Sequence, residues 1–406
     1  MVEMLSNNNI LIQFSISAEQ ISNDSIQNIL KAGDTNSTLK YVSLQQLLSN
    51  PTNLSPFIML YKALATGMVN IYLDISPHLI DVKIGLFNFS PHRHCKLSNE
   101  EVSSLISFVR TFSIKYLTLQ RCTLSNESIN ELCDLIKLNS SLTSVDFTGC
   151  RMADPNVMKL INAIELNFSL KSINLSNNWL SFKSLLIILE LVLNGELQVQ
   201  LDVSPHVADV EEGMFCFCPV FYLPITVEQL LSLQNFPKSF TLRNFTLNRC
   251  QFSEESISAL CDLIKCGSSL TSIDFSLCSL SDCYFMKILS SLQHNSYVNG
   301  LHLTLESNSI GNTGVLALAK ALRLGLPLTK LNLSNNMVGT EGVMALVEAL
   351  NHNSTVETID LQHSSIEVDI QEYAQKVSNG RIKCLQYCPH SDPDTKKDDE
   401  DFCKCM

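Results

Sequence analysis

A short pattern of apolar residues recurs along this chain, most often at steps of 28 residues. Its clearest copy is Leu328-x-x-Leu331-x-Leu333-x-x-Asn336. The last position of the pattern is held in turn by Cys122, Cys150, Asn178, His206, Cys250, Cys278, Asn308, Asn336 and Ser364, and more loosely upstream by Glu19, Leu47 and His78. A period of this length predicts a solenoid, because each unit can bury its apolar side only against its neighbours.

Each unit combines a strand signal with a helix signal. In Leu142-Thr-Ser-Val145-Asp-Phe147-Thr-Gly-Cys150 apolar and polar residues alternate, so that one face is buried and the other is free. The segments between strands have helical spacing, as in the set Ile129, Leu132, Cys133 and Ile136 and the set Val315, Leu318, Ala319 and Leu322. We expect an α/β solenoid of about twelve repeats, a horseshoe with a concave parallel β-sheet and helices on its convex side.

The residue at the end of the pattern has an expected structural role. An asparagine there should satisfy backbone groups of neighbouring turns, and a cysteine should act more weakly as a small apolar filler. His78 and His206 occupy the same position, and we expect them to fill a turn rather than to serve as catalytic bases.

A longer period lies over the short one. Leu73-Asp-Ile-Ser-Pro-His78 recurs as Leu201-Asp-Val-Ser-Pro-His206, and Leu132-Cys-Asp-Leu-Ile-Lys137 recurs as Leu260-Cys-Asp-Leu-Ile-Lys265. Both offsets are 128 residues, so the sequence indicates a tandem duplication of a four-unit block.

One unit in each copy is too long. The steps from His78 to Cys122 and from His206 to Cys250 are 44 residues, and the excess contains the segments 85–92 and 213–220 with two phenylalanines each. Insertions in solenoids often form loops on the binding face. The alternative is that these aromatic side chains pack under the neighbouring repeat.

Three regions are expected along the chain. Residues 1–70 are interpreted as irregular N-terminal repeats and a cap, residues 71–375 as the repeat array with its duplication, and residues 376–406 as an acidic, cysteine-containing flexible tail. End repeats need covering, and the segments 10–14 and 366–373 are the candidate caps. The N-terminus carries no Lys or Arg before its apolar stretch and does not fit a signal peptide.

The repeated frame is the leucine-rich-repeat signature. The 28-residue unit with helix-length spacers resembles the ribonuclease-inhibitor-like class, and Leu331-Asn-Leu-Ser-Asn-Asn336-Met-Val-Gly-Thr-Glu-Gly342 is similar to repeats in the sensor domains of NOD-like immune receptors. The resemblance covers about residues 70–365. It implies a protein that binds other proteins across the concave sheet. The chain departs from those receptors in having no G-x-x-x-x-G-K-[ST] nucleotide-binding motif.

Composition excludes several functions. The formal net charge of −12 disfavours nucleic acid as a partner, because phosphate binding needs a basic face. The fifteen cysteines in a chain without a secretory signal indicate reduced thiols and a cytoplasmic location. No motif predicts catalysis, a metal or a cofactor, so we expect a protein that is not an enzyme and needs no cofactor.

The concave face supplies the candidate partner-binding residues. Interfaces favour Tyr, Trp and Arg, and the remaining candidates are polar residues at strand ends. The set is Tyr116, Arg121, Asp146, Asn174, Asp202, Arg249, Asp274, Asn332 and Asp360. The alternative for each residue is a solvated strand position without a partner.

The C-terminus carries two further motifs. Cys403-Lys404-Cys405-Met406 has the outline of a prenylation box, so Cys403 is a candidate lipidation site, although Lys404 is not aliphatic. The cysteines at 384, 388, 403 and 405 could form a zinc site together with His390, but their spacing fits no standard zinc knuckle. Membrane association is therefore expected only if the C-terminal cysteine is lipidated.

These features favour non-catalytic protein–protein recognition by a scaffold, inhibitor or regulator, acting through the concave sheet and the inserted loops. Two alternatives remain open from the sequence. One is a GTPase-activating protein, since one family of Ran GTPase activators resembles such a horseshoe. The other is a membrane-tethered immune-type sensor, which lipidation of Cys403 would support.

Overall fold

A computed structural model describes residues 13–15, 28, 31, 41–43, 54–67, 72–237, 240–267, 269–297, 300–364 and 366–384. The chain divides into two compact units. The first consists of Met1–Phe221 with Pro237–Thr241, and the second of Tyr222–Phe236 with Leu242–Met406. Each unit is described by itself.

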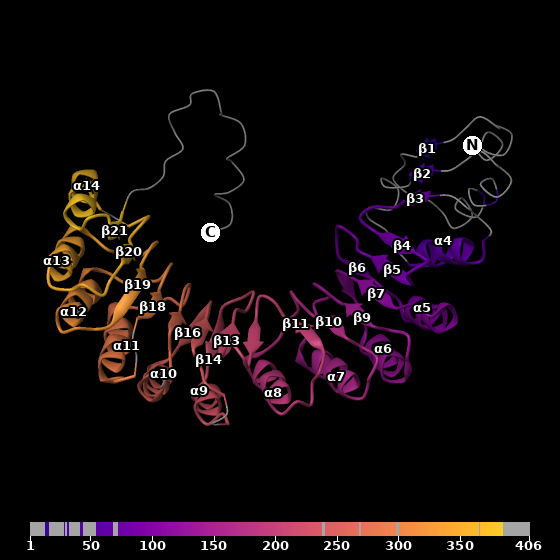
Figure 1. Cartoon of the computed structure of the whole chain (residues 1–406), viewed down its shortest axis with the longest axis horizontal. Coiled ribbons are helices and arrows are strands. Elements are labelled where there is room, and N and C mark those ends of the chain that lie inside the picture. The colour runs from indigo at the N-terminus through magenta and orange to yellow at the C-terminus, as the bar shows by residue number, and fades with distance from the viewer. Residues whose placement is uncertain are drawn as a thin grey trace. The chain divides into compact units, whose positions relative to one another are not determined.

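The first unit is built on a parallel sheet in the order β11-β10-β9-β7-β5, to which β4 is added antiparallel (Figure 1). These strands are β4 (Leu79–Asp81), β5 (Leu86–Phe89), β7 (Tyr116–Leu119), β9 (Ser144–Asp146), β10 (Ser172–Asn174) and β11 (Gln200–Asp202). The other strands are β1 (Gln13–Ser15), β2 (Tyr41–Ser43), β3 (Tyr72–Asp74), β6 (Cys95–Lys96), β8 (Cys122–Thr123), β12 (Val207–Asp209) and β13 (Met214–Phe217). The helices are α4 (Ser55–Ala65), α5 (Asn99–Phe112), α6 (Asn126–Leu138), α7 (Asp154–Glu165) and α8 (Phe182–Leu193).

The second unit repeats this plan with a parallel sheet in the order β15-β17-β18-β19-β20-β21. Its strands are β14 (Leu223–Ile225), β15 (Asn244–Leu247), β16 (Cys250–Phe252), β17 (Ser272–Asp274), β18 (Leu301–Thr304), β19 (Leu328–Asn332), β20 (Thr358–Asp360) and β21 (Ile382–Lys383). Its helices are α9 (Val227–Gln234), α10 (Glu254–Cys266), α11 (Asp282–His294), α12 (Asn312–Arg323), α13 (Thr340–Leu350) and α14 (Val368–Val377).

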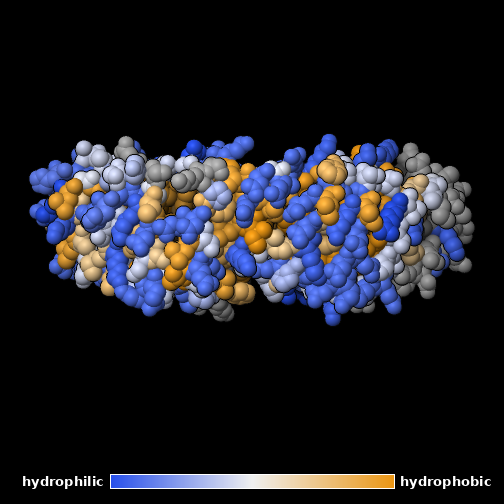
Figure 2. All heavy atoms as spheres, turned by 90° about the horizontal axis from the view of Figure 1, so that it is seen from below, coloured by the Kyte–Doolittle hydropathy of each residue, from blue (hydrophilic) through white to orange (hydrophobic). Residues whose placement is uncertain are grey.

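The 28-residue period is one step across the sheet. Tyr116 pairs with Ser144, Ser144 with Ser172, and Ser172 with Gln200. In each unit the helices lie on one side of the strands (Figure 1). Figure 2 shows that the outer face of these helices is largely hydrophilic, with smaller hydrophobic patches. The prediction of a mixed α/β chain with parallel sheets is therefore confirmed.

Serine side chains start many of the helices. Ser98, Ser125, Ser181, Ser253 and Ser281 each accept a hydrogen bond from the backbone N–H three residues later. These five caps fix where α5, α6, α8, α10 and α11 begin, whereas α7, α12 and α13 begin without a side-chain cap.

Asparagines at the ends of strands tie each turn to the next. The Asn178 Nδ2 donates to the carbonyls of Phe147 and Leu175, both at 2.9 Å, while its Oδ1 accepts the Met152 N–H at 3.0 Å. Asn308 and Asn336 make equivalent bonds across their own turns. The predicted structural role of this position is confirmed, since one buried amide satisfies groups in two neighbouring repeats.

Cysteine and histidine take the same position elsewhere. The Cys150 thiol lies 2.9 Å from the carbonyl of Leu119, and the Cys278 thiol lies 2.8 Å from that of Leu247. His78 and His206 are buried, and their Nδ1 atoms accept the N–H groups of Ser90 and Cys218. The histidines therefore fill turns, as the sequence predicts.

Each of the two 44-residue repeats contains an additional strand rather than a free loop. Phe87 and Phe89 on β5, and Phe215 and Phe217 on β13, are almost fully buried. Strand β5 pairs with β7 inside the sheet, and the ring of Phe89 stacks on His78. The packing alternative is correct for these four aromatic side chains, so the prediction of inserted binding loops is wrong for them.

The array also extends beyond residue 375, the expected boundary of the tail. Strand β21 pairs with β20, and Ile382 is fully buried. The Arg381 guanidinium donates to the carbonyls of Asn353 and Leu350 at 2.8 and 2.9 Å, which closes the last helix turns. The chain from residue 385 onward, including Cys403, lies outside the described residues, as does most of the candidate cap at 10–14.

Replacing Asn308 by alanine should lower the free energy of unfolding by about 2–5 kcal/mol, because buried backbone groups of two neighbouring repeats lose their partner. Asn351 is exposed at the end of α13 and provides the control. Asn351→Ala should change the value by less than about 0.5 kcal/mol. Urea unfolding followed by circular dichroism measures both variants, and equal losses would contradict the proposed role of Asn308.

The buried His206 makes stability depend on pH. Burial lowers its pKa to about 4, although the nearby Asp154 carboxylate acts in the opposite direction. The unfolded chain takes up this proton near pH 6.5, so stability falls as pH drops from there towards 4. His206→Asn should remove up to about 3 kcal/mol of that loss. Urea unfolding at pH 7 and pH 4 measures it, and an unchanged pH dependence would refute the assignment.

Candidate functional site

The predicted acidic and amide residues lie at the ends of strands, where they close turns. The Asp146 Oδ1 accepts the Thr148 N–H at 2.8 Å and the Thr148 hydroxyl at 2.6 Å. Asn174, Asp202, Asp274, Asn332 and Asp360 likewise accept the N–H two residues later, each at 2.9 Å. One oxygen of each side chain is therefore used by the fold, which the Asp-x-Ser/Thr spacing in the sequence could have indicated.

The structure brings part of the predicted set together within each unit. Neighbouring strands of the first unit, β7, β9, β10 and β11, carry Tyr116, Asp146, Asn174 and Asp202. The side chain of Tyr116 is 41% exposed. Asp274, Asn332 and Asp360 lie on neighbouring strands of the second unit, β17, β19 and β20, with β18 between the first two. In both units the helices lie on the other side of the sheet (Figure 1). Residues of the free face, such as Ser144, Ser172 and Ser272, are polar.

Arg121 and Arg249 lie beyond the strand ends, in left-handed backbone. Their φ angles are 53° and 52°, and the same conformation recurs at Gly149, Asn177, Leu277, Ser307, Asn335 and His363. This row of left-handed residues reverses the chain after each strand. It places the arginines at the edge of the sheet rather than on its strand face.

A pocket of about 470 Å³ lies at this edge in the first unit. Four successive turns and the segment that follows β13 supply its walls. Its lining residues are His94, Gln120, Arg121, Thr148, Gly149, Arg151, Asn177, Trp179, Val220 and Phe221. Of the predicted site residues, Arg121 alone lines this pocket.

Backbone hydrogen bonds hold the floor of the pocket. The N–H groups of Arg121, Gly149 and Asn177 donate to Thr148, Ser176 and Ser204 at 2.8, 2.8 and 2.6 Å. The Arg121 Nη1 donates to the Pro91 carbonyl at 3.3 Å, which orients the guanidinium. The floor is therefore part of the repeat itself.

The pocket is electropositive. Partial burial, and then the charges of Arg151 and Arg121, lower the pKa of His94 below its ordinary value. Among the described residues, no carboxylate forms an ion pair with either guanidinium. The nearby Asp146 carboxylate accepts hydrogen bonds from Gln120 and Thr148 instead.

Exposed aromatic side chains line the same pocket. Trp179 is the single tryptophan of the chain and is 48% exposed, and Phe221 is 68% exposed. Sequence reasoning missed His94, Arg151 and Trp179. Arg151 and Trp179 lie 28 residues apart, so the repeat period could have indicated that they are neighbours.

The second copy of the duplication lacks this combination. At an offset of 128, His94, Arg121, Gly149 and Arg151 correspond to Tyr222, Arg249, Leu277 and Ser279. Beyond Cys278 the offset becomes 130, and Trp179 corresponds to Ser309. Only one arginine and no tryptophan therefore occupy the equivalent positions.

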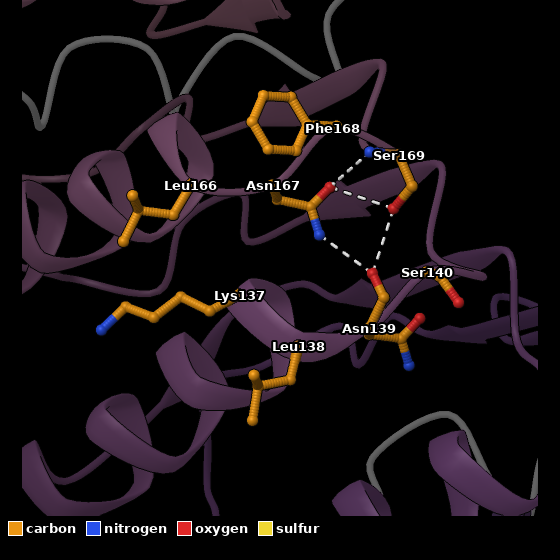
Figure 3. Close-up of a pocket in the computed structure, with 8 residues that line it drawn as sticks. All are labelled: Lys137, Leu138, Asn139, Ser140, Leu166, Asn167, Phe168 and Ser169. Carbon is orange, nitrogen blue, oxygen red and sulfur yellow. Dashed lines mark hydrogen bonds between the residues drawn. The ribbon is translucent and has the colours of Figure 1, made fainter.

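A second pocket, of about 330 Å³, lies where the helices of the first unit end (Figure 3). Leu138, Leu166 and Phe168 line it, and Phe168 is 99% exposed. Below them the Asn167 amide donates to the Asn139 carbonyl at 2.9 Å and ties two helix ends together. Lys137 is the one titratable side chain among the residues that line this pocket.

Two buried cysteine thiols of the repeats are not activated as nucleophiles. Burial raises the pKa of Cys150 to about 12 and that of Cys133 to about 11, whereas a reactive thiol needs a lowered pKa. In the described ranges, no group of three His, Cys, Asp or Glu side chains could hold a metal ion. Within that same part of the chain, the helices are too short or too polar to cross a bilayer.

One short stretch of the chain matches a known family. A family model described as "Leucine Rich repeat" matches residues 327–347. A comparison with curated proteins finds no match.

Three solved structures show weaker likeness. An internalin from Listeria monocytogenes is 14% identical over 96% of this chain and 89% of its own, with a TM-score of 0.36. Leiomodin-1 actin-binding site 2 is 18% identical over 38% and 87%, and the tropomodulin C-terminal domain of Caenorhabditis elegans is 12% identical over 39% and 93%, each with a TM-score of 0.31. At these TM-scores the likenesses carry no argument about this chain.

The electrostatics of the pocket can be tested at His94. Arg151→Asn removes a positive charge while keeping a residue that tolerates left-handed backbone, so the pKa of His94 should rise. Arg249→Asn is the matched control in the second copy and should leave it unchanged. NMR titration of the imidazole C–H signals measures both variants, with His94→Gln assigning the signal. A His94 pKa unaffected by Arg151→Asn would contradict the pocket geometry.

Proposed function

We propose that this chain is a non-catalytic protein–protein recognition module, a scaffold, inhibitor or regulator, that binds its partner through the strand face. One observation carries the proposal: in both units the helices cover only one side of the sheet (Figure 1), and strand residues on the other side, such as Ser144 and Ser272, are polar. A partner chain could contact several repeats at once on such a surface.

The finer identity belongs to the same proposal. A helix between successive strands supports the ribonuclease-inhibitor-like class of leucine-rich repeats and the similarity to NOD-like receptor repeats. We further propose a horseshoe with a concave strand face and a cytoplasmic location. Reduced cysteines in the repeats are consistent with that compartment.

The nine predicted residues have unequal standing in this proposal. Tyr116 and Arg121 offer exposed side chains, whereas the strand-end residues offer only what their turn bonds leave free. We therefore expect contacts across the face to come mainly from Tyr116, from the half-buried serines of the neighbouring strands and from the pocket at the edge.

Capture of partners from a cell lysate tests the strand face. Ser144→Arg with Ser172→Arg places two bulky cations in the middle of the first sheet, at positions paired in register. Proteins retained by the wild-type chain should be lost from this variant, because the added side chains prevent close approach. Quantitative mass spectrometry of the captured proteins measures the loss.

The control carries the same change in charge on the helix side. Thr111→Arg with Asn162→Arg alters two exposed positions on α5 and α7 and should retain the partners. Circular dichroism and melting should show that both variants fold. Partners that remain bound to the strand-face variant would contradict the proposed function.

A further inference from the structure

We propose that the pocket formed by Arg121, Arg151, Trp179 and Phe221 binds an acidic peptide segment of a protein partner, one that places an apolar or aromatic side chain beside its carboxylates. This inference rests on the proposed recognition function and names the chemistry of the bound segment. Its argument comes from charge, from exposed apolar surface and from the backbone below the pocket.

Charge complementarity points to an acidic ligand. The chain carries a net charge of −12, yet two guanidiniums line this pocket and form no ion pair with any described carboxylate. Carboxylates bind guanidinium through charge-assisted, often bidentate hydrogen bonds. Two arginines from neighbouring turns could therefore engage two acidic side chains of one extended segment.

The apolar wall points to a peptide rather than to a small inorganic anion. Trp179 and Phe221 are exposed, and Val220 beside them is 51% exposed. These apolar side chains would not contribute to the binding of an inorganic anion. Tryptophan and arginine are also the side chains that dominate binding energy at protein interfaces.

The size and rigidity of the pocket fit the same ligand. About 470 Å³ accommodates a few side chains of a peptide but not a folded domain. Its floor is fixed by interstrand backbone bonds and by the Arg121 contact with Pro91, so little ordering is needed on binding. Gly149 leaves the floor open where the second copy has the larger Leu277.

The divergence of the two copies supports a local specialisation. The duplicated positions keep one arginine but replace the second by Ser279 and the tryptophan by Ser309. The strand-end residues and helix caps retain their structural roles in both copies. His94, Arg151 and Trp179 are therefore not retained with these structural residues, although the copies also differ at many other positions between residues 79 and 120.

A random heptapeptide library selected on the full-length chain tests the proposal. Selected sequences should be enriched in Asp and Glu together with an aromatic or aliphatic residue. The best peptide should shift the fluorescence of Trp179, which reports on the pocket because the chain has no other tryptophan. Its affinity should fall as salt rises, since the contacts to both guanidiniums are partly exposed.

Variants define the site. Arg121→Asn with Arg151→Asn should weaken the peptide by about tenfold or more, because two charge-assisted contacts are lost. Arg249→Asn, with the same left-handed backbone in the second copy, should bind normally. The same peptide with Gln and Asn in place of Glu and Asp should not bind.

Three results would overturn the inference. They are selected peptides without acidic residues, peptides that bind the double variant as well as the wild type, and a phosphate ion that displaces the peptide completely at low millimolar concentration. Failure here is separable from failure of the proposed function. If Ser144→Arg with Ser172→Arg loses its captured partners but no acidic peptide binds the pocket, recognition stands and this inference falls.

Discussion

The hydrogen bonds of the strand-end side chains hold the rest of the structure in place. Asn178, Asn308 and Asn336 each join carbonyls of two neighbouring repeats and accept an N–H from the preceding repeat. Because these groups are buried, leaving them unpaired would cost more than an ordinary surface bond contributes. A buried amide at this position therefore fixes the register of one repeat against the next. The cysteines and histidines keep the position filled.

This constraint also explains where a binding site can arise. Once the turns are locked in register, residues 28 positions apart become neighbours along the edge of the sheet. The turns after the strands then display side chains that the fold itself does not need, such as Arg121 and Arg151. Substitution there changes the surface without disturbing the hydrogen bonds below it. The pocket in the first unit is an example. Its residues have no equivalent set in the duplicated copy, although the hydrogen-bonded turns below them recur.

Much of the frame could be predicted from the sequence, because it depends on periodic apolar positions such as Val145 and Ile173, which are buried as expected. The strands β5 and β13 could not, since Phe87 and Phe215 enter the sheet through a hairpin outside the 28-residue frame. The strand-end acids were identified as binding residues because a polar residue on a free face looks the same whether it meets a partner or its own turn. The pocket was missed, Arg121 excepted, because its residues come from turns, and their proximity depends on the register of the sheet.

Hydrogen exchange at single residues tests the central claim most directly. The N–H groups of Met152 and Ile310 are not part of any strand ladder, and they donate to the Oδ1 atoms of Asn178 and Asn336 at 3.0 Å. If these asparagines lock the units together, both amides should exchange as slowly as the Phe147 N–H, which donates to the Asn174 carbonyl of the neighbouring strand. Exchange as fast as that of the exposed turn amide of Lys83 would contradict the account.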